Sequence, residues 1–497
     1  MTRTAERFLR TGLLALALAV FSYTQADPDL WGHILFGRDT AVSGAVAQVD
    51  PYSFTSDRPW INHEWLAELA SYEAWARGGS AGLIVLKALL LLLMLRACIS
   101  NLPAGTAPEA LAFVVGVVVI GTLPQAIHVR PQLFSLTLFA ILLRTLAGGW
   151  GSAGHDRIND AVVPVAIITL WANLHGGWIA GVGTLGLWVA VSVVQRRPWR
   201  ERLWMILVAG AAVLASVLNP YGWRLWVFLQ TTVGFGREGI TDWQPVYRMV
   251  PAFVVLWLAL ATVAGLALRQ AVRQGRADIR NVAVVLLFGL GSFRVNRLMA
   301  FFAISTIVLF GDRLAELVAA PPDRDLAPGA RRRTAVAAIA LAITLGLAAA
   351  AIIYRNASCV IVNPSQVPDP RSTQALAASS LRGRLLTPFD WGQYAIWYLS
   401  PRLLVSLDGR RETIYSDGII NKQFGLLEDP VGHASVLGEL AADYAWLPSG
   451  ALLVPFLESA GWTRLAGTEH TVILAREPAP PLMVPAGRIG PRCFPGP

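Results

Sequence analysis

Long apolar segments dominate this chain and constrain its fold more than any other feature. Segments long enough, or nearly so, to cross a hydrocarbon layer of about 30 Å number about eleven: 8–24, 81–99, 108–126, 131–147, 160–175, 177–195, 203–218, 251–268, 281–293, 298–311 and 334–354. Charged residues make up only 15% of the 497 residues, and the mean hydropathy is +0.51. Soluble domains carry about 25% charged residues. We therefore predict a polytopic α-helical membrane protein.

Arginines fall in alternate loops between the predicted spans. Counted along the chain, the loops that share one side carry Arg3, Arg7, Arg10, Arg196, Arg197, Arg200, Arg202, Arg269, Arg273, Arg276, Arg280, Arg331, Arg332 and Arg333. Loops rich in arginine face the cytoplasm, so we predict a cytoplasmic N-terminus in a bacterial inner membrane. The net charge of +9 follows from these loops, and it does not indicate nucleic acid binding.

The first apolar segment has a second interpretation. Its basic start, its apolar core and Thr24-Gln25-Ala26 also fit a signal peptide that is cleaved before Asp27. We favour an uncleaved anchor, because it would hold the acidic residues that follow against the next helices.

The first outward loop, residues 25–80, is long enough to have structure of its own. Asp29 is placed to cap a short helix that ends near Gly44. From Trp65 onward apolar residues recur at helical spacing while acidic residues face elsewhere, which indicates an amphipathic helix too polar to span. We expect both helices to lie along the outer surface of the membrane.

Acidic, basic and histidine side chains gather on this outward side, opposite the arginine-rich loops. Carboxylates at a membrane surface are costly unless they meet a cation, a proton or a substrate. The candidate catalytic residues are Asp27, Asp29 and Glu64, and the candidate substrate-binding residues are His33, His63, Arg130, Arg294 and Arg297. Each has a structural alternative: the acids can favour helix starts, and the arginines can extend to lipid headgroups.

The order of these features resembles the GT-C class of polytopic glycosyltransferases across about the first 100 residues. The resemblance rests on Asp27 and Asp29 after the first span, a short helix, and Asn62-His63-Glu64-Trp65 before a second helix. This chain departs from the pattern of some members of the class, which have adjacent Asp-Glu where it has Asp-Pro-Asp. The resemblance implies a sugar donor linked to a polyprenyl phosphate and an acceptor in the cell envelope.

Such chemistry needs a carboxylate to accept the proton of the acceptor hydroxyl and cations to hold the departing phosphate. Asp27 or Asp29 would be the base, and Arg294 with Arg297 is the favoured phosphate-binding pair. Asp27 and Asp29 are also able to hold Mg²⁺ or Mn²⁺, although two carboxylates alone indicate a metal only weakly.

After the last span the composition changes, and residues 355–497 have the character of a small soluble α/β domain on the extracytoplasmic side. Strands are expected at 385–387, 403–407, 444–447 and 471–474, with helices near 391–398, 419–427, 433–442 and 451–460. Asp390-Trp391-Gly392 and Asp408-Gly409-Arg410-Arg411 are either turns held by Asp–Arg ion pairs or a cap over the membrane cavity. Cys359 and Cys493 flank this region, and we predict a disulfide between them.

The predicted organisation is therefore a transmembrane GT-C-like domain, 1–354, followed by the α/β domain, 355–497. The predicted function is a membrane glycosyltransferase. The alternatives are a transporter or flippase for a lipid-linked glycan, whose charges would line a path at mid-depth, a polysaccharide polymerase or ligase, and a non-catalytic assembly subunit. The sequence leaves the sugar, the acceptor and any metal requirement open.

Overall fold

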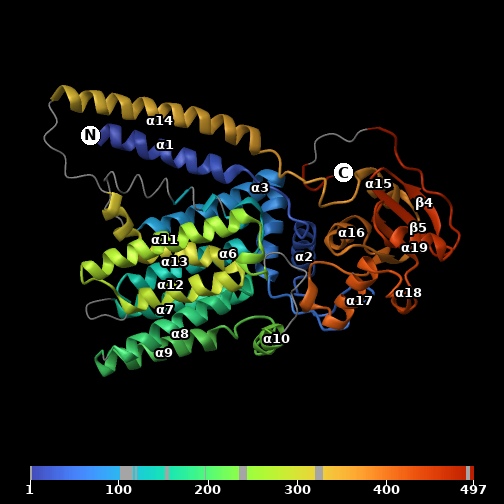
Figure 1. Ribbon diagram of the computed structural model, residues 1–497, viewed down its shortest axis with the longest axis horizontal. Helices are drawn as coiled ribbons and strands as arrows, with labels where there is room; N and C mark the ends of the chain where they lie inside the picture. Colours follow the sequence, from blue (N-terminus) through green and yellow to red (C-terminus); the bar gives the residue numbers. More distant parts are fainter. Residues whose placement is uncertain are drawn as a thin grey trace.

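Helices form most of the computed structural model, with a small sheet region at one end of them (Figure 1). The structure describes residues 3–100, 116–117, 120–121, 123–150, 156–195, 197–233, 243–318, 328–487 and 493–496. The long helices are α1 (Arg3–Ser22), α3 (Trp65–Ile99), α6 (Gln132–Ala147), α7 (Arg157–Leu174), α8 (Trp178–Val194), α9 (Trp199–Ala215), α11 (Pro251–Arg273), α12 (Ile279–Arg294), α13 (Met299–Val318) and α14 (Pro328–Asn356). Shorter helices are α2 (Leu30–Ser43), α5 (Pro124–Ile127) and α10 (Arg224–Val233).

Most predicted spans carry a helix. The exception is 108–126, most of which lies outside the described residues. Within the described part of the chain, four helices are long and apolar enough to cross a membrane by length and composition: Trp65–Ile99, Pro251–Arg273, Asn296–Glu316 and Arg332–Asn356. The count of about eleven spans therefore stays a prediction.

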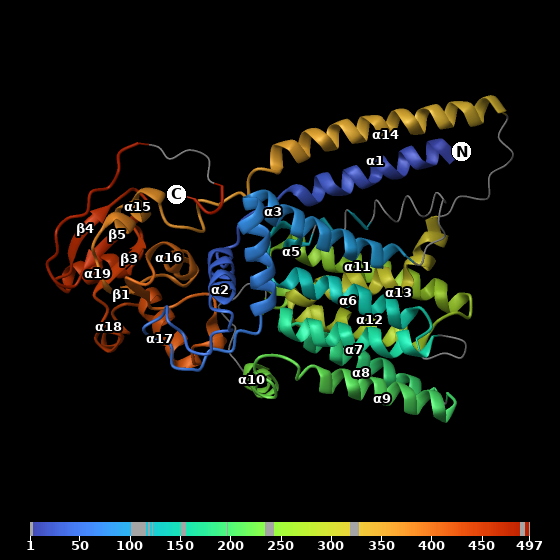
Figure 2. The ribbon, with the colours of Figure 1, turned by 180° about the vertical axis from the view of Figure 1, so that it is seen from behind.

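The bundle consists of α3, α6–α9 and α11–α13, while α1 and α14 pack side by side along one flank (Figures 1 and 2). Its core is a continuous apolar cluster that includes Phe139, Trp171 and Phe301. Aromatic rings meet edge to face inside it, as where Phe139 contacts Phe301 at 4.8 Å between ring centres. Close packing of such rings stabilises the helices against one another, because helices in lipid associate through van der Waals contacts.

Helix α3 bends at Gly79, whose φ of 54° and ψ of −139° interrupt the helix. A residue without Cβ adopts this conformation at little cost. The part from Trp65 stands across the ends of the bundle beside α2, and the later part runs along the bundle (Figure 2). The predicted pair of helices in the first loop is therefore present, and α2 ends at Gly44 as expected.

Five strands form a mixed sheet in the order β2-β1-β3-β5-β4. They are β1 (Gly383–Leu386), β2 (Leu403–Val405), β3 (Tyr444–Pro448), β4 (Thr463–Gly467) and β5 (Thr471–Ala475), with helices α15 (Pro370–Ala378), α16 (Gly392–Leu399), α17 (Asp417–Glu428), α18 (Ala434–Leu440) and α19 (Leu453–Ser459). β1 is parallel to β2 and β3, whereas β5 is antiparallel to β3 and β4. The four predicted strands are present, and β4 was not predicted.

A short ladder of backbone pairs joins distant segments just beyond the end of α1. The Gln25 N–H donates to the Ile127 carbonyl at 3.0 Å, and the Ala26 N–H donates to the Ile361 carbonyl at 2.8 Å. The predicted disulfide between Cys359 and Cys493 is confirmed and fixes the C-terminal tail to the same place. The ladder brings the loop that carries Asp27 and Asp29 beside the loop that carries Arg130.

Lys87, inside α3, is held by the same segments. Its Nζ donates to the carbonyls of Tyr23, of Ala126 at 2.9 Å and of Ile127 at 3.4 Å. A lysine inside a predicted span can extend to the lipid headgroups or pair with an acidic residue. Lys87 binds backbone carbonyls instead.

Replacing Lys87 by methionine should destabilise the protein. Lys87→Met removes three hydrogen bonds and leaves carbonyl groups in a buried place, at a cost of at least about 2 kcal/mol. We expect a lower unfolding temperature by intrinsic fluorescence in detergent, with Val85→Met as the control because Val85 is 56% exposed on the same helix. Equal unfolding temperatures for the two variants would contradict this assignment.

Candidate functional site

A cavity of about 650 Å³ lies where the ends of the bundle helices meet α2, the start of α3 and the sheet region. Its polar wall includes Asp29, His33, His63, Glu64, Glu68, Arg130, His175, Arg297, Arg410, Arg411 and Glu412. Its apolar wall includes Leu136, Ile179, Ala180, Trp226, Phe228, Leu229, Leu298 and Phe301. The cavity therefore suits a ligand with one charged and one hydrocarbon part.

The two aspartates after α1 share one guanidinium. Nη2 of Arg130 lies 2.8 Å from Oδ2 of Asp29 and 3.1 Å from Oδ1 of Asp27. Asp29 stands at the start of α2, but its side chain makes no capping hydrogen bond. Asp29 is therefore the N-cap residue of α2, as predicted, but its side chain does not cap the helix because the carboxylate turns to Arg130. Asp27 accepts the Asp29 N–H at 3.0 Å, and of the two acids only Asp29 lines the cavity.

Asp29 titrates near neutral pH. Burial disfavours its charged form, and repulsion by Asp27 adds to this effect, while Arg130 and His33 act in the opposite direction. Together these raise the pKa of Asp29 to about 6. A carboxylate with this pKa is largely ionised at pH 7 and is a better proton acceptor than an ordinary aspartate.

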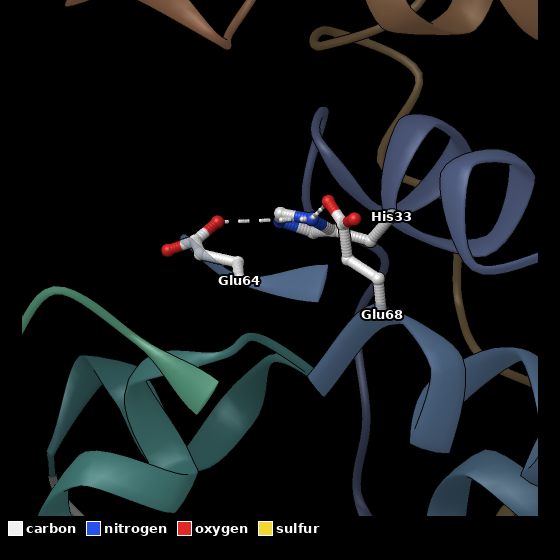
Figure 3. A group of neighbouring side chains, drawn as sticks. All are labelled: His33, Glu64 and Glu68. Carbon is white, nitrogen blue, oxygen red and sulfur yellow. Dashed lines mark hydrogen bonds and ion pairs between the residues drawn. The ribbon is translucent and has the colours of Figure 1, made fainter. Parts of the chain in front are cut away.

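A second polar cluster consists of His33, Glu64 and Glu68, and Figure 3 shows the histidine ring between the two glutamates. Nδ1 of His33 is 3.1 Å from Oε1 of Glu68 and 4.0 Å from Oε2 of Glu64. Burial opposes the charge on His33, but the Glu68 hydrogen bond and the attraction of both glutamates outweigh it and raise the pKa of His33 to about 9. This histidine is therefore positively charged at neutral pH.

Glu64 is surrounded by basic groups. Its Oε1 lies 3.4 Å from Nε2 of His175 and 3.8 Å from Nε2 of His63. Burial would raise the pKa of Glu64, but His63, His175, His33 and Arg297 lower it to about 2. Glu64 is therefore a stable anion and a poor proton acceptor.

His175 lies in the turn between α7 and α8 and was not among the predicted site residues. Its Nδ1 accepts the Gly177 N–H at 2.9 Å and lies 2.7 Å from the hydroxyl of Ser135. This network assigns the proton of the neutral ring to Nε2, which faces Glu64. Burial, with a smaller contribution from Arg297, lowers the pKa of His175 to about 3, so the ring is neutral.

The structure separates the two arginines that the sequence paired. Arg297 lines the cavity, with Nη2 3.4 Å from Nε2 of His175 and its guanidinium 5.5 Å from the centre of the Trp243 ring. Arg294 is exposed and does not line the cavity. His33, His63 and Arg130, also predicted, all line it.

The 408–413 loop, Asp408–Thr413, reaches the cavity from the sheet region. Arg410 pairs with Asp408 at 2.7 Å and with Asp50 at 2.5 Å, so the predicted turn held by Asp–Arg ion pairs is present. Gly409, Arg410, Arg411, Glu412 and Thr413 also line the cavity, as does Phe389, whereas Asp390 does not. Residues 408–411 had been singled out from the sequence as a turn or a cap, whereas Glu68 and His175 were not among the predicted site residues.

A divalent metal fits the second cluster better than the predicted position. Asp27 and Asp29 already share a guanidinium, and a metal there would face a competing positive charge. One ligand atom from each of His33, Glu64 and Glu68 lies within 4.8 Å of the others. A nitrogen with two carboxylate oxygens suits Mn²⁺ or Zn²⁺, which would act there as a Lewis acid.

Known structures resemble this chain in fold. The oligosaccharyltransferase AglB from Archaeoglobus fulgidus, solved with an inhibitory peptide and a dolichol-phosphate, is 11% identical, with a TM-score of 0.54 over 89% of this chain and 69% of that one. The mycobacterial arabinofuranosyltransferase AftD is 18% identical, with a TM-score of 0.51 over 96% of this chain. The chain spans only 40% of AftD. No protein-family model and no curated protein matches the chain.

These likenesses show a shared fold: AglB and AftD are GT-C glycosyltransferases, and this chain resembles them in fold. The resemblance seen in the first 100 residues is thereby confirmed and extends over most of the chain.

The raised pKa of Asp29 predicts how the free energy of unfolding changes with pH. The folded protein binds this proton more tightly than the unfolded chain, so the contribution of Asp29 to stability falls as pH rises from about 4 to about 6. Asp29→Asn removes the penalty, and we expect it to stabilise the protein at pH 7.5 by up to about 3 kcal/mol. At about pH 4 the variant and the wild type should unfold at similar temperatures. Lower stability of the variant at pH 7.5 would contradict the burial argument.

Metal binding by His33, Glu64 and Glu68 should depend on pH. The proton on His33 must leave before its nitrogen can bind a metal. We therefore expect Mn²⁺ to raise the unfolding temperature more at pH 8 than at pH 6, and to have no effect on His33→Ala. An equal rise in His33→Ala would exclude this cluster as the binding site.

Proposed function

We propose that this protein transfers a sugar from a polyprenyl-phosphate-linked donor to a hydroxyl of an envelope glycan, lipid or protein on the extracytoplasmic face. The observation that carries the proposal is Asp29, with its raised pKa, beside Arg130 in a cavity with one polar and one apolar wall. The shared fold supports it, since AglB was solved with a dolichol-phosphate.

Asp29 is the proposed base. The acceptor oxygen attacks the anomeric carbon of the sugar, and its proton passes to the carboxylate of Asp29. The bond between the anomeric carbon and the phosphate oxygen breaks, and the polyprenyl phosphate leaves with the electron pair. Asp27 acts through Arg130 and through its repulsion of Asp29, which raises the basicity of the reacting carboxylate.

Arg297 is the proposed partner of the donor phosphate. It lines the cavity together with the apolar residues Leu298 and Phe301, which are close to it in sequence. The lipid chain would follow the apolar wall while the phosphate meets the guanidinium, which stabilises the charge of the leaving group.

Glu64 has a different proposed role from the one expected. With a pKa of about 2, it is too weakly basic to accept a proton at neutral pH. As a stable anion in the cavity lining, Glu64 would stabilise the positive charge that develops on the sugar ring when the bond to phosphate breaks.

Two observations support the extracytoplasmic face for this site. The arginine-rich loops lie on the opposite side of the predicted topology. The disulfide between Cys359 and Cys493 suits an oxidising compartment, and its segment pairs with the loop that leads to Asp27 and Asp29.

The proposal predicts the effect of removing the base. Loss of a general base costs about 10²–10⁴-fold in rate, so a strain with Asp29→Asn should have the same envelope glycans as a deletion strain. The measurement is mass spectrometry of those glycans, together with the amount of protein in the membrane. Asp39→Asn is the control, because Asp39 lies in the same loop, is 40% exposed and does not line the cavity.

The glycan profiles of these strains also distinguish an enzyme from a transport or assembly protein. If deletion changes the glycans but Asp29→Asn and Asp27→Asn both leave the wild-type profile, the enzyme proposal fails and transport or assembly becomes the better explanation. If Asp29→Asn alone is inactive, Asp29 is the base and Asp27 supports it.

A further inference from the structure

One glycine in the sheet region lies directly against the proposed base. Gly409 has no side chain, and a Cβ at this position would stand 1.8 Å from Oδ1 of Asp29 and 2.9 Å from Nε2 of Gln393. No side chain fits there unless Asp29 moves. The close approach joins residues 380 positions apart in the sequence.

The 408–413 loop cannot easily retreat from this contact. Arg410 is only 7% exposed and forms ion pairs with Asp408 and Asp50. Its guanidinium also lies 4.8 Å from the centre of the Trp60 ring, in the first loop. A buried charge held by two carboxylates and an aromatic ring fixes the backbone that carries it.

Asp29 is equally restricted on its other side, where Oδ2 accepts the hydrogen bond from Arg130 at 2.8 Å. The carboxylate is therefore held between a guanidinium from the bundle side and a glycine from the sheet region. We propose that Gly409 is a positioning residue that sets the orientation of Asp29, so that the sheet region is part of the reacting site and not only a cap over it. This inference rests on the proposed function.

The variant Gly409→Ala tests the contact. The added methyl group would occupy the place of Oδ1, so the carboxylate must turn out of its position, and Oδ2 then loses the hydrogen bond from Arg130. Arg130 lowers the pKa of Asp29 against burial and Asp27, so this loss leaves His33 as the other nearby cation. We expect the pKa of Asp29 to rise by about one unit. The measurement is infrared difference spectroscopy of the purified full chain during a pH titration, with the Asp29 band assigned by its loss in Asp29→Asn.

The matched control is Gly438→Ala in α18, where a Cβ would meet no atom within 4 Å. Its titration midpoint should equal that of the wild type. A displacement of about 1 Å can cost 10²-fold in rate, so Gly409→Ala should also reduce the envelope glycan product, and the control should not. An unchanged Asp29 midpoint in Gly409→Ala overturns the inference, even if the product falls.

A second variant covers the case in which Gly409→Ala does not fold. Asp29→Ala removes the carboxylate atoms that the new methyl group would overlap and leaves Nε2 of Gln393, the end of a flexible side chain that can move at little cost. Asp29→Ala with Gly409→Ala should therefore unfold at the same temperature as Asp29→Ala alone. A lower unfolding temperature of the double variant would overturn the inference. The proposed function fails on a different result, wild-type glycans in Asp29→Asn, so the two failures are distinguishable.

Discussion

The guanidinium of Arg130, shared between Asp27 and Asp29, is the interaction on which the rest of the site depends. Two carboxylates two residues apart repel each other, and the cation between them allows both to stay close in a partly buried place. The backbone ladder at Gln25 and the amino group of Lys87 bring the arginine there from a loop about a hundred residues later. Burial and the remaining repulsion by Asp27 keep the pKa of Asp29 raised. This property links the packing of the helices to the proposed chemistry.

The charged groups that line the cavity around this pair differ in the charge they carry at neutral pH. His33 and Arg297 are cations, Glu64 is a stable anion, and Asp29 alone among these groups titrates near pH 6. Such a division follows from burial, because a buried charge persists only when an opposite charge is near. The apolar wall continues into the bundle, so a lipid chain and a charged headgroup would each find a matching surface. The sheet region completes the polar wall through the 408–413 loop.

Much of the fold followed from sequence pattern, because apolar length is a property of continuous segments. The short α2, four of the five strands and the Cys359–Cys493 disulfide were all expected. A helix from Trp65 and a separate span at 81–99 were expected as well, and the structure joins them as α3 with a bend at Gly79. β4 was missed because its few apolar residues do not alternate clearly. Within the site, Asp29, Glu64, Arg130 and Arg297 were found by their position on one face, whereas Arg294, three residues away from Arg297, points elsewhere. The contacts of His175 with Glu64 and of Gly409 with Asp29 join remote segments, and no local pattern reveals such contacts.

The most direct test of the account is a structure of the protein with a polyprenyl monophosphate bound. The account predicts the lipid chain along the apolar wall, the phosphate within hydrogen-bonding distance of Arg297, and the carboxylate of Asp29 facing the open space beside it. A lipid phosphate bound outside this cavity, with Asp29 facing away from it, would contradict the central claim.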